Sequence, residues 1–390
     1  MHRPVLRDVV EEHLEELAFL SIQRRRMLFS PDVGPRGVRG IDARLNAHHD
    51  AVRIAGADGL AIAVERLSEP DAWHRYAALR IWLEDGRPAA PRVLDRIGEA
   101  DDETARAWRE ALRRSPGEVA RALAAAGAED AGALALITDA CSWHGAPLPA
   151  PAGTLAGSDD PGVRAATARG LGANERSLIG RLIEDADPRV ARSALWSLAL
   201  CDPGDARAHC RLRLERGEAE PFVIQTLGLL GDHDDVSRLL PAVAHDKLRD
   251  AAIRALGHLG AADVAPLLLG LIGSSDRDTQ RAATDALEAI TGPLAPPPRR
   301  RLPRESDAGP DPLPAAWAAS EWQRVAPRYD AGRRYQSGWP FPDAPPGDQP
   351  MSFHWRRAVV GADPGAAWLR REVPDGFFDA APTHEARPGE

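Results

Sequence analysis

Histidine and its neighbours are the residues of this chain best suited to metal or acid–base chemistry. In the stretch AHHD, His48, His49 and Asp50 are consecutive, and on a helix three consecutive side chains point in different directions. His13 and Glu16 have the i, i+3 spacing that places two ligands on one helix face, but the sequence offers no second histidine alongside. We therefore predict neither a metal ion nor a cofactor at these residues.

Motifs for phosphate binding and nucleophilic catalysis are absent, since the chain has no GxGxxG, GxxxxGK[ST] or GxSxG sequence. Residues 153–160 are small but lead into a turn, and we expect a loop there. Aspartate and arginine recur at such turns, as in Asp160 with Arg164 and Asp187 with Arg192. We interpret these residues as helix caps and ion pairs between repeats, not as acid–base pairs. No catalytic residue is predicted.

The charge of the chain limits the classes of partner. The formal net charge is −9, whereas broad binding to nucleic acid needs a basic face. No apolar run is long enough to cross a membrane, and the N-terminal residues lack the apolar stretch of a secretory signal. Cys141, Cys201 and Cys210 lack CxxC spacing, which is typical of buried thiols in a reducing compartment. We expect a cytoplasmic protein without a membrane partner.

A repeating unit runs through the middle of the chain. Similar segments place a leucine at one position, at intervals of 27, 29, 29 and 31 residues: Leu171, Leu198, Leu227, Leu256 and Leu287. Less regular upstream copies place Ile81, Leu112 and Ala140 there. A unit of about 30 residues with two helices buries its apolar faces only by stacking on its neighbours. We therefore predict an all-α solenoid of helical hairpins over residues 57–292.

Each of the clearer copies begins with an acidic turn and ends in a second apolar stretch. The acidic residues expected to cap the first helix of each repeat are Asp160, Asp187, Asp246 and Asp276. The predicted second helices are 176–185, 207–215, 235–243 and 263–273.

The segments in 160–292 resemble the HEAT-like repeats of bacterial proteins, in which an Asp-Pro turn leads into VRxxAxxALG and a leucine-rich second helix. EEHLEELAFLSIQRR and IDARLNAHHDAVRIAG resemble the N-terminal region of a little-characterised bacterial HEAT-like family, often encoded with type VI secretion components. The matching residues are His13, Glu16, Phe19, Leu20, Leu45, His48, Arg53 and Gly56. The chain departs from the pattern at Ile41, His49 and Val52. The resemblance implies a partner in a secretion apparatus, but no mechanism.

The two ends differ from the repeats. Helices over 4–29 and 41–56 are expected to form an N-terminal helical cap, residues 1–56. The Pro- and Arg-rich stretch 293–314 is predicted to be an extended linker, followed by a helix and an irregular tail in 315–390. Two interpretations of the tail's tryptophans remain open: they hold it against the repeats, which we favour, or they form a contact surface for a partner.

Other HEAT-like proteins suggest alternative functions. Di-iron members carry several His-Glu dipeptides, whereas this chain has only His384-Glu385. Base-excision glycosylases use a basic face, and bilin lyases share only the repeats. We favour a non-enzymatic protein–protein interaction scaffold, in which second helices line a concave surface. Its candidate partner-binding residues are Arg181, Glu184, Arg211, Arg213, Glu215, Arg238, Trp317 and Trp322.

Overall fold

The computed structural model describes residues 6–28, 33, 35–85, 88–98, 102–292, 294 and 313–341. These residues fall into two compact units, one that ends at Cys201 and one that begins at Asp202. Nearly every element is a helix, which confirms the predicted all-α fold. Most of the predicted linker and all of the tail after residue 341 lie outside the described residues.

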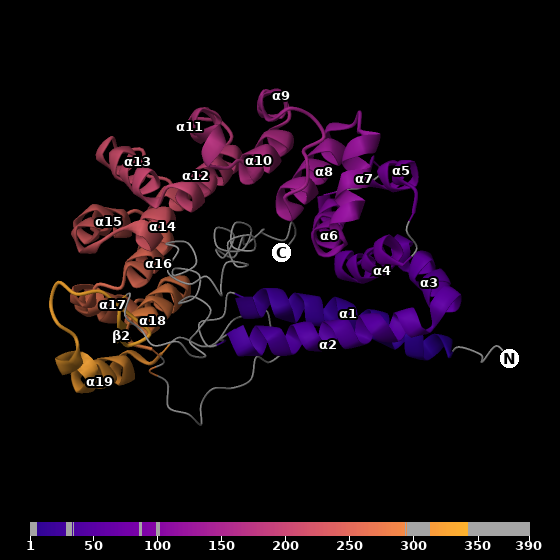
Figure 1. Ribbon diagram of the computed structural model, residues 1–390. Coiled ribbons are helices and arrows are strands. Elements are labelled where there is room, and N and C mark those ends of the chain that lie inside the picture. The colour runs from indigo at the N-terminus through magenta and orange to yellow at the C-terminus, as the bar shows by residue number, and fades with distance from the viewer. Residues whose placement is uncertain are drawn as a thin grey trace, which may run out of the picture. The chain divides into compact units, whose positions relative to one another are not determined.

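The first unit contains the N-terminal helices and the upstream repeats (Figure 1). Its elements are α1 (Arg7–Leu28), α2 (Pro35–Ile54), α3 (Gly56–Glu65), η1 (Arg66–Ser68), α4 (Ala72–Glu84), α5 (Ala90–Gly98), α6 (Asp102–Arg114), α7 (Gly117–Ala126), α8 (Ala131–His144), α9 (Ala152–Ala156), α10 (Pro161–Gly170), η2 (Ala173–Glu175), α11 (Arg176–Ile183) and α12 (Pro188–Cys201). The short helix α9 lies where a loop was expected, because Pro151 precedes it and its Leu155 is buried.

The second unit continues the same alternation of helices. Its elements are α13 (Pro203–Glu215), α14 (Pro221–Leu230), η3 (His233–Asp235), α15 (Val236–Val243), α16 (Arg249–Leu259), η4 (Ala262–Val264), α17 (Ala265–Ile272), α18 (Arg277–Thr291), α19 (Ala315–Val325), η6 (Ala326–Arg328), β1 (Tyr335–Gln336) and β2 (Trp339–Pro340).

The helices of each unit form two rows. In the first unit α4, α6, α8, α10 and α12 pack against one another, and in the second α14, α16 and α18 do so; the other helix of each repeat packs on this first row. The predicted core positions explain the packing, since all but one are buried: Ile81, Leu112, Ala140, Leu171, Leu227, Leu256 and Leu287. Leu198 is only half-buried, because Leu195 and Trp196 fill the core of that repeat.

Small residues bring the helices of the first row into backbone contact. A Cβ atom added to Gly228 would lie 2.6 Å from the Cα atom of Ala255, and one added to Gly257 would lie 2.5 Å from that of Ala286. In the first unit the Ser197 hydroxyl donates to the Ala168 carbonyl at 2.6 Å. A larger side chain at either glycine would force these helices apart.

The N-terminal helices differ from the prediction at their junction. We expected the second helix to begin at residue 41, but α2 begins at Pro35. Proline suits the first helical turn because that turn needs no N–H donor, and Val38 is fully buried by the earlier start. Gly56 adopts a positive φ of 60° between α2 and α3, which favours glycine.

Part of the tail that we expected to be irregular is a β-hairpin, in which β1 pairs antiparallel with β2. Its backbone meets the C-terminal ends of α16 and α18, and the side chain of Arg334, just before it, reaches the end of α14. The contacts are Arg334 Nη1 to Gly231 O, Tyr335 N to Gly260 O at 2.7 Å and Ser337 N to Ala289 O at 2.7 Å. Carbonyls at helix ends lack partners within the helix, so the hairpin satisfies them and holds this part of the tail against the repeats.

Candidate functional site

A buried carboxylate joins three successive repeats of the first unit. Asp139, on α8, is 3% exposed. Arg113 of α6 donates to it through Nε at 2.8 Å and Nη2 at 3.0 Å, and Arg169 of α10 lies 2.6 Å away. Burial alone would raise the pKa of Asp139, but the two guanidinium groups hold it below its usual range. Because both oxygens are engaged, this aspartate is a structural ion-pair centre and is poorly placed for acid–base catalysis.

Aromatic stacking completes this cluster. The guanidinium of Arg113 lies 4.9 Å from the ring centroid of Trp143, and that of Arg114 lies 5.8 Å from it. Glu110 is 3.6 Å from Arg113. The members of the cluster come from three helices, α6, α8 and α10, so no local sequence motif links them.

The acidic turns serve two purposes. Asp160 and Asp276 accept the backbone N–H of Val163 and Thr279, and so cap α10 and α18. Asp187 accepts the N–H of Arg189 at 2.8 Å at the start of α12. The ion pair between neighbouring turns differs from the expected pairing. Its members are Arg164 and Asp185, joined by two hydrogen bonds of 2.7 and 2.9 Å.

Asp246 does not cap its helix, contrary to the prediction. The helix α16 begins at Arg249 with Leu248 at the N-cap position, two residues after Asp246. Asp246 instead lies 2.6 Å from the Arg249 guanidinium.

Three of the predicted partner-binding residues, Arg211, Glu215 and Arg238, belong to an ion-pair network on α13 and α15. Arg211 donates to Asp235 at 2.7 and 2.8 Å and to Asp232 at 2.9 Å. Arg238 lies 3.4 Å from both Asp235 and Glu215. Asp235 is fully buried and anchors both arginines.

Arg213 faces a different pair of acids. It lies 2.7 Å from Glu218 and 3.0 Å from Glu220, which tie the end of α13 to the turn before α14. In the first unit, Arg181 and Glu184 are exposed on α11.

The expected concave placement of the second helices is wrong for the first unit. Figure 1 shows α5, α7, α9 and α11 on the outer side of the arc formed by α4, α6, α8, α10 and α12.

Two exposed leucines accompany the network on α13 and α15. Leu212 is 43% exposed and Leu240 is 40% exposed. The helices that carry them are joined by the Glu215–Arg238 ion pair. The sequence alone does not single out these leucines, because the helical pattern makes them ordinary core positions.

The two tail tryptophans occupy different settings. The Trp317 indole donates to the Leu294 carbonyl at 2.9 Å and is 36% exposed. Trp322 packs against Tyr329, with ring centroids 5.5 Å apart, and Tyr329 contacts the buried Tyr335. Within the described part of the tail, these rings support the interpretation that aromatic residues hold it in place.

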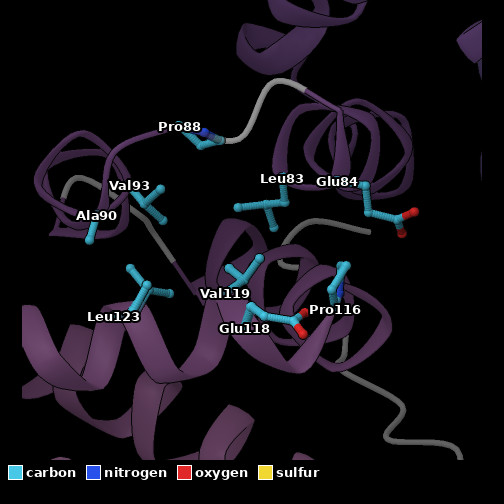
Figure 2. Close-up of a pocket in the computed structure, with 10 residues that line it drawn as sticks. Leu83, Glu84, Pro88, Ala90, Val93, Pro116, Glu118, Val119 and Leu123 are labelled. Carbon is cyan, nitrogen blue, oxygen red and sulfur yellow. The ribbon is translucent and has the colours of Figure 1, made fainter.

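A cavity of about 350 Å³ lies between the end of α4, α5 and α7 (Figure 2). Its apolar wall includes Leu83, Val93, Val119 and Leu123. Glu84 and Glu118 also line it, but Glu84 already contacts His49 at 3.1 Å and Arg80 at 3.0 Å. Burial alone would raise the pKa of Glu84, whereas these two contacts hold it below its usual range. The cavity suits a small apolar group and offers no pair of poised acids.

The N-terminal residues that matched the bacterial family lie around α1 and α2. His48 Nδ1 is 3.0 Å from His13 Nδ1, and Arg53 Nε is 2.8 Å from Asp85. His48 therefore provides the second histidine that the sequence analysis did not find beside His13.

Three further features bear on chemistry. In the described part of the chain, no group of three or more His, Cys, Asp or Glu side chains could hold a metal ion. Cys141 and Cys210 are buried, Cys201 is half-buried, and burial raises the pKa of Cys141 to about 11. None of the helices described here is sufficiently long and apolar to span a membrane.

Comparison with known proteins gives one family match. Residues 236–302 match the family model of HEAT repeats, over the segment that contains α15 to α18. No curated protein matches the chain. Two crystal structures of engineered proteins are similar: one is 14% identical, covers 95% of this chain and 99% of its own, and has a TM-score of 0.29; the other is 17% identical, covers 72% and 96%, and has a TM-score of 0.20. The match shows HEAT repeats over residues 236–302, and stacked helical hairpins are the fold of both units.

Proposed function

We propose that the chain is a non-enzymatic protein-interaction scaffold and that its partner docks on the exposed surface of α13 and α15. The observation that carries the proposal is the pair of exposed leucines, Leu212 on α13 and Leu240 on α15, two helices that the Glu215–Arg238 ion pair joins. Protein interfaces commonly combine apolar anchors with a polar rim.

The charged rim of this surface is already ordered. Arg211 and Arg238 are held by the buried Asp235, and Arg211 also by Asp232. Side chains that are fixed before binding lose less conformational entropy when a partner arrives. A partner with apolar side chains and charges of both signs fits this arrangement.

The N-terminal resemblance supports a finer proposal about the setting. We infer that the partner is a component or effector of a type VI secretion apparatus, and that the protein acts in the cytoplasm. The support is the match of His48, Arg53 and Gly56 to the bacterial family's pattern.

Affinity capture from native cells with quantitative mass spectrometry tests the surface. The full chain is compared with the double variant Leu212→Asp/Leu240→Asp and with the control Ile54→Asp, since Ile54 is 86% exposed on α2. We expect a protein retained by the wild type and the control to fall at least tenfold in the double variant. An unchanged set of captured proteins would contradict the proposed surface.

A separate measurement tests the absence of enzymatic function. Stoichiometric iron or a visible chromophore in the purified protein would favour the HEAT-type enzymes, and salt-dependent association with duplex DNA would favour the nucleic-acid binders. We expect neither.

A further inference from the structure

Two histidines from different helices meet on one side of the N-terminal pair. His13 lies on α1 and His48 on α2, and the helices run side by side in Figure 1. Their Nδ1 atoms are 3.0 Å apart, and their rings meet at 65° with centroids 5.1 Å apart. Both side chains are half-buried, so solvent reaches them.

The distance between the two Nδ1 atoms is close to that between two nitrogens bound to one metal ion. Imidazole nitrogens bind divalent transition metals at about 2.0–2.1 Å, so two nitrogens at right angles around one ion are about 2.9 Å apart, and at the tetrahedral angle about 3.4 Å. The observed 3.0 Å is a hydrogen-bond distance in the absence of a metal and lies in this range. Two imidazole nitrogens completed by water suit the square-planar arrangement of Cu²⁺ and Ni²⁺, whereas Zn²⁺ prefers a tetrahedron.

We propose that His13 and His48 form a two-nitrogen site for Cu²⁺ or Ni²⁺ that links α1 to α2. Water completes the coordination shell, because no third ligand of the described chain completes a cluster. The site is independent of the scaffold surface on α13 and α15.

The charged groups around the pair are of both signs. Glu12 and Glu16 face His48 and oppose the lowering of its pKa, which burial causes first and His13 second. Arg44 lowers the pKa of His48, and its guanidinium lies 3.9 Å from Glu16.

The test uses the full chain without an affinity tag. Calorimetric titration with NiCl₂ at pH 7.5 is expected to give one site per chain, and His13→Ala and His48→Ala are each expected to weaken it about tenfold or more. His74→Ala is the matched control, because His74 contacts only a carboxylate of its own helix turn, Asp71 at 3.1 Å. A rise in Tm on adding Ni²⁺ should occur in the wild type and the control, since the ion binds the folded state.

A spectroscopic measurement separates a chelate from scattered surface binding. With less than one equivalent of Cu²⁺, the electron paramagnetic resonance spectrum should show hyperfine coupling to two nitrogens in the wild type and to fewer in His48→Ala. Absence of a stoichiometric site, or a site that survives both histidine substitutions, would overturn the proposal. Tighter binding of Zn²⁺ than of Ni²⁺ would overturn the assigned geometry.

Discussion

The repeats at the two ends of the array stack in the same way but through side chains of very different size. In the second unit, Gly228 and Gly257 let α14, α16 and α18 meet at the backbone. In the first unit, α4 and α6 meet through large rings, Trp82 and Trp108, whose centroids are 6.1 Å apart in an edge-to-face arrangement. Glycine and alanine fix the separation of two helices closely, whereas bulky side chains fill a wider gap.

This difference explains why the repeat pattern is sharp downstream and less regular upstream. A backbone contact at Gly257 allows no larger residue, so the sequence keeps its small residues in register. The space around Trp108 can be filled by several kinds of large side chain. The sequence motif is therefore less regular there, although the helices are still formed. We therefore expect that removing a large side chain destabilises the upstream repeats by leaving a cavity. Enlarging a small side chain is expected to destabilise the downstream repeats by overpacking.

The largest expected effect is a cavity at Trp108. Trp108→Ala removes a fully buried ring between α4 and α6, and we expect a loss of about 4 kcal/mol in the free energy of unfolding. Urea denaturation followed by circular dichroism measures it. Trp73→Ala is the control, because Trp73 is only half-buried on α4. Equal losses in both variants would mean that packing at Trp108 is not what holds α4 and α6 together.

The next effect concerns the ion-pair centre at Asp139. Asp139→Ala leaves Arg113 buried without its carboxylate, and we expect a loss of about 3 kcal/mol. Because the pKa of Asp139 is lowered in the folded state, its stabilisation is present above about pH 4 and is lost as the pH falls further. The wild type and the variant should therefore converge in acid urea titrations. Glu110→Ala should change little, and a constant difference at all pH values would contradict the assignment.

A larger side chain at Gly257 should lower the free energy of unfolding by less than the changes at Trp108 and Asp139. A methyl group there would meet the Ala286 backbone, and we expect Gly257→Ala to lose about 2 kcal/mol. Gly270→Ala is the matched control, since no atom lies within 4 Å of its added Cβ in the exposed face of α17. That variant should gain about 0.5–1 kcal/mol from helix propensity. If both substitutions stabilise the protein, the close approach of α16 and α18 is not a constraint.

Sequence patterns predicted the repeats well because the interactions that define a repeat join residues close to one another in the sequence. The leucine intervals placed Leu256 and Leu287 in the core, and both are fully buried. The acidic turns at Asp160 and Asp276 placed two helix starts correctly. A helix cap and its N–H partner are three residues apart, so one short stretch of sequence contains the whole interaction.

The features that the sequence missed join distant residues. His13 and His48 are 35 residues apart, and Arg113 and Asp139 are 26 apart. The β-hairpin at Tyr335 pairs with the end of a helix at Gly260, where neither segment alone indicates a partner. Periodicity reports which face of a helix is buried, but the neighbour that buries it is set by the fold.

The smallest expected change in stability distinguishes Asp276, which caps its helix, from Asp246, which does not. Asp276 accepts the backbone N–H of Thr279 at 3.1 Å, whereas the exposed Asp246 contacts the guanidinium of Arg249. We expect Asp276→Ala to lower the free energy of unfolding by about 1 kcal/mol, and Asp246→Ala to change it by less than about 0.3 kcal/mol. Urea titrations of the two variants measure the difference. If Asp246→Ala costs as much as Asp276→Ala, then α16 begins earlier in solution and the acidic turn caps it after all.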